Sequence, residues 1–302
     1  MNKRIALVTY QQQERYTAGV SDNEDDNLLR FLREKGVDIE PVIWNAPGVN
    51  WQQYDVAIIK SPWDYHEQID AFYNWLRATE QLGVQFLNPV DMMIWNSNKK
   101  YLLEIAATGL PIIPSELIAK GSSPGWHTFF SRWHTDKIVV KPCVSAGAKN
   151  TLLLTTGEIA AKQEELKALL QEEDYLVQPF MKEIGEGEWS FVFFGGQFSH
   201  VLLKTPRDGD FRVQHYHGGS FREAAVAGDY ISKAGAYVQH FAKGALYVRV
   251  DGVIKEGEFY LMELEMIEPY LYLSTAKHGY DNYYNALTGI LSASSTQAPA
   301  GF

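Results

Sequence analysis

A continuous apolar run close to the start of the chain, residues 5–10, is the feature that most restricts its fold. A strand that is apolar at every position, without alternation, is covered on both faces, as in a parallel sheet packed between helices. Helix-like and strand-like segments then alternate up to the turn Asn88-Pro89. This order predicts a small parallel α/β domain over residues 1–95.

The segment after the first strand lacks the pattern Gly-x-Gly-x-x-Gly, and the chain contains no P-loop pattern. Two common sequence signatures of phosphate binding are therefore absent.

The pattern of strands and helices changes after residue 95. Short β-prone runs flank the small-residue loop 142–148, a hairpin is centred on Gly195-Gly196, and runs 246–254 and 258–265 form another strand pair. These segments predict an antiparallel α+β unit in the remainder of the chain.

The charge of the chain limits its partners and its surroundings. The net charge is −10 and no lysine- or arginine-rich run occurs, which argues against nucleic acid or an anionic membrane as partner. With Cys143 as its one cysteine, the chain forms no internal disulfide. The first apolar run is too short for a signal peptide or a membrane span, so we expect a cytoplasmic protein.

Carboxylates recur near the end of the chain, at Asp251, Glu263 and Glu265. Positions two apart on a strand face the same side, so the two glutamates lie together, and Asp251 joins them if its strand pairs antiparallel. Carboxylates gathered on an apolar strand need a counter-ion, and hard oxygen ligands suit magnesium. The alternation also fits a half-exposed strand with solvated glutamates, so this segment alone leaves both interpretations open.

Two lysines stand where a phosphate could be held. Lys141 ends a strand and enters the loop 142–148, whose small residues let backbone N–H groups approach an anion, although an ordinary hairpin loop has the same composition. Lys100 stands at a helix start, where the helix dipole disfavours a cation. Either a bound anion or simple solvation explains that position.

Two loops are predicted to act as lids that exclude water, 142–148 and the polar, glycine-rich excursion 205–219. In the first domain, Trp63, Asp64 and Tyr65 follow a strand. We interpret them either as substrate contacts or as aromatic packing between lobes.

Taken in order, these segments resemble the ATP-grasp superfamily, and within it the bacterial glutathione synthetase branch. The motifs that carry the resemblance are Asn98-Lys99-Lys100, Val140-Lys141-Pro142, Val177-Gln178-Pro179-Phe180, Gly187-Glu188-Trp189-Ser190, Lys204-x-Pro206, Arg212, Gly218-Gly219, Asp251 and Glu263-x-Glu265. The first domain, with Lys60-Ser61-Pro62-Trp63-Asp64-Tyr65, is similar to the group that includes the ring-closing ligase of D-cycloserine biosynthesis.

The resemblance implies an ATP-grasp fold over 96–302, with a smaller nucleotide-covering subdomain at 96–176 and a C-terminal subdomain at 177–302. It implies ATP contacts from Lys100, Lys141, Gln178, Pro179, Phe180, Met181 and Glu188. Lys204 and Arg212 would face the transferred phosphoryl and the acyl phosphate. Magnesium, or manganese, would be held by Asp251, Glu263 and Glu265, and substrate by Trp63, Asp64, Tyr65, Gly218 and Gly219.

The implied activity is that of a ligase that activates a carboxylate as an acyl phosphate for capture by an amine and releases ADP and phosphate. The implied partners are a small acid and an amine, such as an amino acid or dipeptide, and related enzymes form homodimers or homotetramers. Glu265, where asparagine is frequent, and Ser190, where glutathione synthetases carry arginine, argue against glutathione as product. A non-catalytic ATP-binding module and a phosphotransferase without amine acceptor stay open as alternatives.

Overall fold

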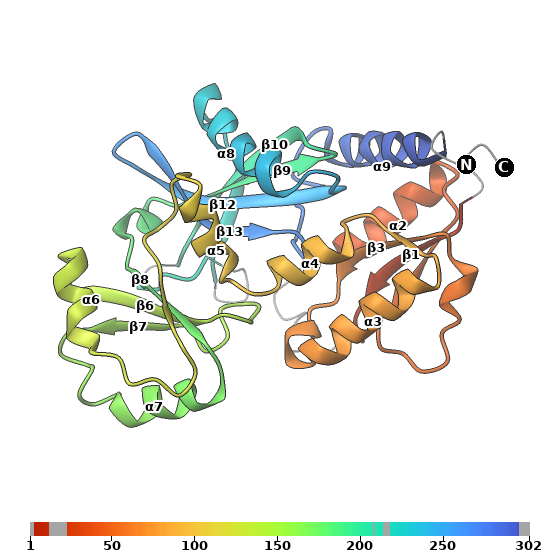
Figure 1. Ribbon diagram of the computed structural model, residues 1–302. Coiled ribbons are helices and arrows are strands. Elements are labelled where there is room, and N and C mark those ends of the chain that lie inside the picture. Colours follow the sequence, from red (N-terminus) through yellow and green to blue (C-terminus); the bar gives the residue numbers. More distant parts are fainter. Residues whose placement is uncertain (1–2, 12–22, 208, 214–217, 296–302) are drawn as a thin grey trace.

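The computed structural model describes residues 3–11, 23–207, 209–213 and 218–295. The front domain is built on a parallel sheet in the order β2-β1-β3-β4, as the apolar runs predict. Its strands are β1 (Ile5–Thr9), β2 (Ile39–Ile43), β3 (Val56–Ser61) and β4 (Gln85–Phe86), and helices α2 (Glu24–Glu34) and α3 (Ile69–Gln81) pack against them. Figure 1 labels β1 and β3 of this sheet, with helices α2 and α3 beside them.

A small antiparallel sheet in the order β5-β8-β6-β7 follows. Its strands are β5 (Glu116–Ile118), β6 (Lys137–Pro142), β7 (Leu152–Thr155) and β8 (Tyr175–Pro179). Ile138 and Val140 pack against helices α6 (Trp126–Trp133) and α7 (Gln163–Glu172), whereas Val139 and Lys141 line a cavity. The alternation of side chains along β6 therefore separates the core of this sheet from a functional face.

The large sheet has the order β11-β10-β9-β12-β13 and is antiparallel throughout. Its strands are β9 (Glu188–Phe194), β10 (Gln197–Thr205), β11 (Ser220–Glu223), β12 (Tyr247–Lys255) and β13 (Glu258–Glu265). Helices α5 (Tyr101–Ala107) and α8 (Gly228–Phe241) cover one face, where Val250 and Leu264 are buried. The other face carries Asp251 and Glu263 towards the cavity.

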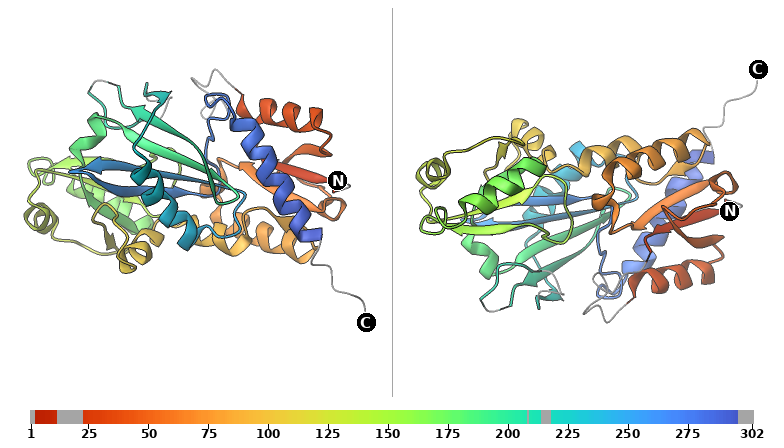
Figure 2. Two further views of the ribbon diagram at one scale, coloured as in Figure 1. Left: turned by 90° about the horizontal axis from the view of Figure 1, so that it is seen from above. Right: turned by 90° about the horizontal axis from the view of Figure 1, so that it is seen from below.

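The two ends of the described chain meet in the front domain. The last helix, α9 (Gly279–Ser295), lies across that domain (Figure 2) and buries Tyr283, Leu287 and Leu291 against it and the large sheet. Helix α4 (Val90–Asn96) connects the front domain to α5. Short 3₁₀ turns lie at Trp51–Gln53, Tyr65–Glu67 and Lys182–Gly185.

One subdomain boundary falls inside a strand. Residues 176 and 177 lie within β8, which pairs with β5 and β6 and so belongs entirely to the small sheet. The division of the chain into 1–95, 96–176 and 177–302 stays a prediction. In the part of the chain that the structure describes, no helix is long and apolar enough to cross a bilayer.

Candidate active site

A cavity of about 540 Å³ lies where the small sheet, the large sheet and the front domain meet. The small sheet contributes Lys141 and Gln178, the large sheet Glu188, Asp251 and Glu263. The front domain closes one side with the segment that contains Trp63 and Tyr65. A ligand here would contact all three parts of the fold, the usual position of a substrate site.

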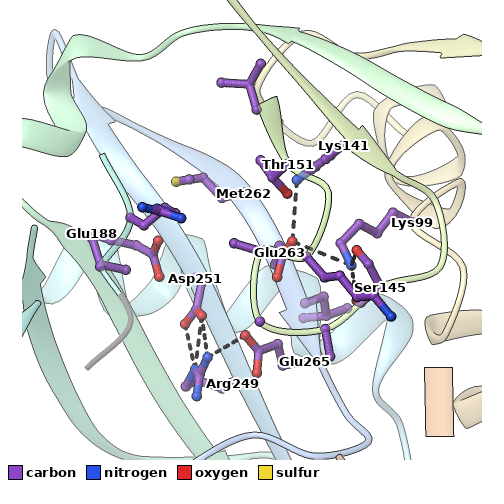
Figure 3. A pocket seen from close by; sticks show the side chains of 18 of the residues that line it. Lys99, Lys141, Ser145, Thr151, Glu188, Arg249, Asp251, Met262, Glu263 and Glu265 are labelled. Atoms are coloured by element: carbon purple, nitrogen blue, oxygen red, sulfur yellow. Dashed lines mark hydrogen bonds and ion pairs between the residues drawn. The ribbon is translucent and has the colours of Figure 1, made fainter. Parts of the chain in front are cut away.

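The carboxylates of β12 and β13 face this cavity (Figure 3). Asp251 and Glu263 are partners in the antiparallel register, and Glu265 lies two residues further along β13. Arg249 stands between them: its Nη2 donates to Asp251 Oδ2 at 2.8 Å and also to Glu265 Oε1. Its Nη1 donates to the carbonyl of Tyr270 at 2.8 Å. A buried guanidinium therefore links two of the three carboxylates.

The carboxylates are held by protein cations. Among the described residues, no group of three His, Cys, Asp or Glu side chains is close enough together to hold a metal ion. The metal assignment to Asp251, Glu263 and Glu265 is therefore still a prediction. Burial, together with Asp251 and Glu263, raises the pKa of Glu265 to about 8 despite Arg249. Negative charge is in excess at this place, and such oxygen ligands fit a hard divalent cation.

Two lysines contact Glu263 from the opposite side of the cavity (Figure 3). Lys141 Nζ lies 3.4 Å from Glu263 Oε1, and Lys99 Nζ lies 3.8 Å from the same atom. Lys99 also donates to the carbonyl of Ser145 at 2.8 Å, so it ties the loop 142–148 to the cavity.

Lys100, the predicted ATP ligand, does not line this cavity. It pairs with Asp174, and its side chain is 39% exposed against 13% for Lys99. The reason is local: the backbone N–H of Lys99 donates to the carbonyl of Cys143, which places Lys99 beneath the loop. The neighbouring side chain then points another way. The position of Lys99 makes it the better candidate of the two.

Lys204 is buried between two carboxylates. Its Nζ pairs with Glu188 and lies 3.2 Å from Asp251 Oδ2. Burial alone would lower the pKa of Lys204, but Asp251 and Glu188 outweigh it and raise the pKa. The ammonium therefore stays charged in the cavity wall.

The predicted adenine segment runs along one wall. Gln178, Pro179, Phe180 and Met181 all line the cavity, and the Gln178 amide donates to Ser115 Oγ at 2.8 Å. Apolar side chains lie beside them: Ile113, Val139, Ile184, Phe211 and Met262. The apolar side chains of this wall suit contact with a nucleobase.

Three predicted substrate contacts do not line the cavity. Asp64 is buried in the front domain and accepts a hydrogen bond from Trp44 Nε1 at 2.8 Å. Gly218 and Gly219 are also absent from the wall. A Cβ on Gly219 would lie 2.1 Å from the carbonyl oxygen of Val213, so close backbone packing explains this glycine. Of this group, Trp63 and Tyr65 do line the cavity.

Both predicted lids reach the cavity in part. Ser145, Ala146, Gly147 and Ala148 line it from the first loop, and Phe211, Arg212 and Val213 from the second. Arg212 is held by Asp210, with Nη2 donating to Oδ2 at 2.8 Å. Residues 208 and 214–217 of the second loop lie outside the described residues.

Several cavity residues were missed by sequence reasoning, chiefly Lys99, Arg249, Glu268 and Tyr272. For Arg249, the sequence did contain a usable pattern. Arg249 stands two residues before Asp251 on a strand, so period-two alternation puts both side chains on one face. The others depend on contacts between distant segments.

The chain matches two family models. Residues 107–270, more than half of it, match the ATP-grasp domain of prokaryotic glutathione synthetases. Residues 5–88 match the N-terminal domain of D-cycloserine synthetase DcsG.

Individual relatives agree with these matches. The cycloserine biosynthesis protein DcsG of Streptomyces lavendulae is 25% identical over 273 residues, 86% of this chain and 91% of that protein. The crystal structure of D-cycloserine synthetase DcsG has a TM-score of 0.81 at 24% identity, covering 95% of this chain and 99% of that one. D-alanine–D-alanine ligase from Bacillus anthracis has a TM-score of 0.73 at 13% identity, covering 98% and 100%. These likenesses show the fold.

Proposed function

We propose, from the premise that this chain belongs to the ATP-grasp family of prokaryotic glutathione synthetases, that it activates a small carboxylic acid as an acyl phosphate and joins it to an amine. At the level of the family, the chain is an ATP-dependent ligase of carboxylates and amines. The acyl phosphate, the substrates and the role of each residue are the proposed part.

The observation that carries the proposal is the opposition of charges in one cavity. Lys99 and Lys141 enter from one side, and the carboxylates of β12 and β13 from the other. In the free protein these groups neutralise one another. A triphosphate would take over the lysines, and a divalent cation would take over the carboxylates, so both ligands bind best together.

Asp251, Glu263 and Glu265 would hold magnesium, and manganese accepts the same oxygen ligands. The ion, when bound, neutralises phosphate charge that otherwise repels the incoming carboxylate. The protein side chains orient the nucleotide. Lys99 and Lys141 orient the phosphates, and the wall from Gln178 to Met181 positions the base.

A carboxylate oxygen of the acid attacks the γ-phosphorus, and the bond to the bridging oxygen breaks to give ADP and an acyl phosphate. The nitrogen of the free amine then attacks the acyl carbon, the proton that it loses passes to solvent, and the tetrahedral intermediate collapses by breaking the C–O bond to release inorganic phosphate and the amide. An arginine is suited to hold the acyl phosphate and the oxyanion.

Two arginines line the cavity and compete for that role. The side chain of Arg249 is 8% exposed and faces the carboxylate strand, whereas that of Arg212 is 36% exposed and is bound to Asp210. Burial strengthens the interaction of a guanidinium with an anion. We therefore favour Arg249 as the residue that holds the acyl phosphate, in place of Arg212, which the family resemblance implied.

The substrates are proposed to be small and amino-acid-like. D-Cycloserine synthetase and D-alanine–D-alanine ligase, by their names, make small amino-acid-derived products. The cavity also has to hold the nucleotide, and its volume of about 540 Å³ leaves space for compact partners. A homodimer or homotetramer remains a prediction.

The test is ADP release from ATP and MgCl₂ with a panel of D- and L-amino acids and dipeptides, followed by mass analysis of products. ADP release that depends on both an acid and an amine supports the ligase. Release that needs the acid alone and yields a stable phosphorylated product indicates a phosphotransferase. ATP binding without turnover on any pair indicates a non-catalytic module.

A further inference from the structure

Glu268 differs from the other carboxylates of the cavity. Within the described part of the chain, the others have cationic partners: Glu67 with Lys149, Glu188 with Lys204, Asp251 and Glu265 with Arg249, and Glu263 with Lys99 and Lys141. No cation of the described residues pairs with Glu268, although its residue lines the same cavity. Burial, the largest effect, raises the pKa of Glu268 to about 7 against the influence of Lys99. This carboxylate lacks the positive charge that its neighbours have.

The backbone that presents Glu268 is held from several directions. Trp63 Nε1 donates to the carbonyl of Glu268 at 3.3 Å, and Arg249 donates to that of Tyr270 at 2.8 Å. The Glu24 carboxylate accepts the N–H groups of Leu271 and Leu273 at 2.8 and 2.9 Å. A segment held in this way presents its carboxylate in a defined place and loses little entropy when a ligand binds.

Aromatic side chains also line the cavity. Tyr270 and Tyr272 lie with ring centroids 4.8 Å apart, and Phe221 stands 4.7 Å from Tyr272. Trp63 lines the cavity beside them. Tyr270 already has the Lys60 ammonium 5.9 Å from its ring centroid, which illustrates the affinity of such rings for cations.

A second polar group of the cavity wall, the His66 ring, has its Nε2 3.9 Å from Glu67 Oε1 but leaves its other nitrogen unpaired within the described chain. The side chain of His66 is 4% exposed, and its Nδ1 is buried with no hydrogen-bond partner among the described residues. Burial lowers the pKa of His66, so the ring is neutral and one of its nitrogens accepts a hydrogen bond. A buried acceptor without a donor is unfavourable unless a ligand supplies one.

Both groups require the same kind of ligand. A carboxylate and an imidazole nitrogen each accept hydrogen bonds, and aromatic faces attract positive charge. An alkylammonium ion offers three N–H donors and one positive charge. We propose that Glu268 and His66 form the subsite that binds the amine substrate as its ammonium ion, which gives up one proton to water before its nitrogen attacks the acyl carbon. This inference rests on the proposed ligase function and specifies the chemistry of its acceptor.

The test compares a charged amine with a neutral one. Hydroxylamine is uncharged near neutral pH and captures acyl phosphates as hydroxamates. Each D- and L-amino acid is first offered as the acid, with ATP, MgCl₂ and hydroxylamine, and hydroxamate is measured. The acid found is then paired with amino acids as amines, and Glu268→Gln is compared with the wild-type protein on both nucleophiles.

We expect Glu268→Gln to raise the KM for the amino-acid amine by about tenfold or more, because a charge-assisted contact is lost. Hydroxamate formation should stay within about threefold of wild type, since the neutral nucleophile does not need that charge. Glu268→Asp, which keeps the charge, should recover part of the lost affinity. Glu258→Gln is the matched control: this carboxylate lies on β13 outside the cavity wall and pairs with Lys233 of α8, and its variant should behave as wild type.

The results separate two kinds of failure. Equal effects of Glu268→Gln on both nucleophiles, or no effect on either, would overturn the ammonium subsite and leave the ligase standing. If no acid yields hydroxamate or amide with the wild-type protein, the proposed function fails and the subsite with it. Thermal denaturation checks that Glu268→Gln is folded. If it is not, His66→Gln takes its place, and its KM for the amino-acid amine is compared with its rate of hydroxamate formation in the same way.

Discussion

The ammonium group of Lys141 lies 3.4 Å from the carboxylate of Glu263, and this contact joins the small sheet to the large sheet across the cavity. Burial lowers the pKa of Lys141 more strongly than Glu263 raises it. Burial would raise the pKa of Glu263, but Lys99 and Lys141 together outweigh it and lower the pKa. A triphosphate could take the place of Glu263 beside Lys141, and a metal ion could take the place of Lys141 beside Glu263.

Glu263→Gln removes the charge of this carboxylate and keeps its shape. If Glu263 holds magnesium, ADP release should fall by about a hundredfold or more at saturating MgCl₂, while the variant still unfolds in a cooperative thermal transition. Glu258→Gln on the same strand is the control. Normal turnover of Glu263→Gln would remove this residue from the proposed metal site.

Lys99→Ala and Lys100→Ala distinguish two neighbouring lysines that the sequence alone cannot rank. Lys99 faces the cavity, whereas Lys100 pairs with Asp174 outside it. Loss of a charged contact to phosphate should raise the KM for ATP by about tenfold to a hundredfold in Lys99→Ala. Lys100→Ala should change it much less. The reverse order, measured by initial rates against ATP concentration, would reinstate the prediction for Lys100.

The front domain could be predicted well from the sequence because its signals are local. The apolar run at β1 specifies a strand covered on both faces, and parallel pairing of β1 with β2 and β3 follows from the helices between them. Helix ends were less accurate. The sequence predicts helices over residues 225–246 and 98–108, whereas the structure has the shorter helices α8, Gly228–Phe241, and α5, Tyr101–Ala107. Ends depend on tertiary contacts, which a local pattern does not contain.

The candidate site likewise contains some features that local sequence predicts and others that depend on tertiary contacts. The common face of Asp251 and Glu263 follows from strand alternation and antiparallel register. Strand alternation does not tell which lysine contacts Glu263, because that depends on a backbone hydrogen bond between Lys99 and Cys143, which are far apart in the sequence. Glu268 was missed for the same reason. Its significance comes from the absence of a cation among the described residues, and spacing says nothing of that.

Glu24→Gln tests how the front domain holds the segment from Glu268 to Leu273. The Glu24 carboxylate pairs with Lys60 at 2.9 Å, both side chains being 1% exposed, and accepts two backbone N–H groups. Breaking a buried pair costs about 3 kcal/mol of unfolding free energy, with Asp25 left as the partner of Lys60. Urea unfolding measures the change. Glu40→Gln, in an exposed pair with Arg4, should have a much smaller effect, and equal losses would contradict this role of Glu24.

The stability of the free protein should depend on pH through buried histidines. Burial lowers the pKa of His200, whose ring contacts the Leu271 carbonyl at 2.9 Å. The unfolded chain then takes up a proton below about pH 6.5 that the folded chain does not. The free energy of unfolding should fall with decreasing pH, by at most about 1.4 kcal/mol per pH unit for this histidine.

His200→Gln should make this fall less steep between pH 6.5 and 5.5, measured by urea unfolding at each pH. The variant is compared with wild type because other groups titrate as well; the raised pKa of Glu265, for example, lowers stability as pH rises. His240→Gln, at an exposed position on α8, is the control. An unchanged slope in His200→Gln would show that His200 takes up its proton equally in both states.

Arg249→Lys and Arg212→Lys decide which arginine meets the acyl phosphate. Lysine keeps the charge but cannot reproduce contacts to Asp251, Glu265 and the Tyr270 carbonyl at once. If Arg249 stabilises the transferred phosphoryl, its variant should lose about tenfold to a thousandfold in kcat, with the KM for ATP nearly unchanged. Arg212→Lys should then affect kcat far less, because Arg212 is more exposed and is bound to Asp210. Initial rates of ADP release, with hydroxamate trapping to isolate the first step, give both constants. A larger loss of kcat in Arg212→Lys would return the role to the second loop, and Arg249 would then serve to hold Asp251 and Glu265 in place.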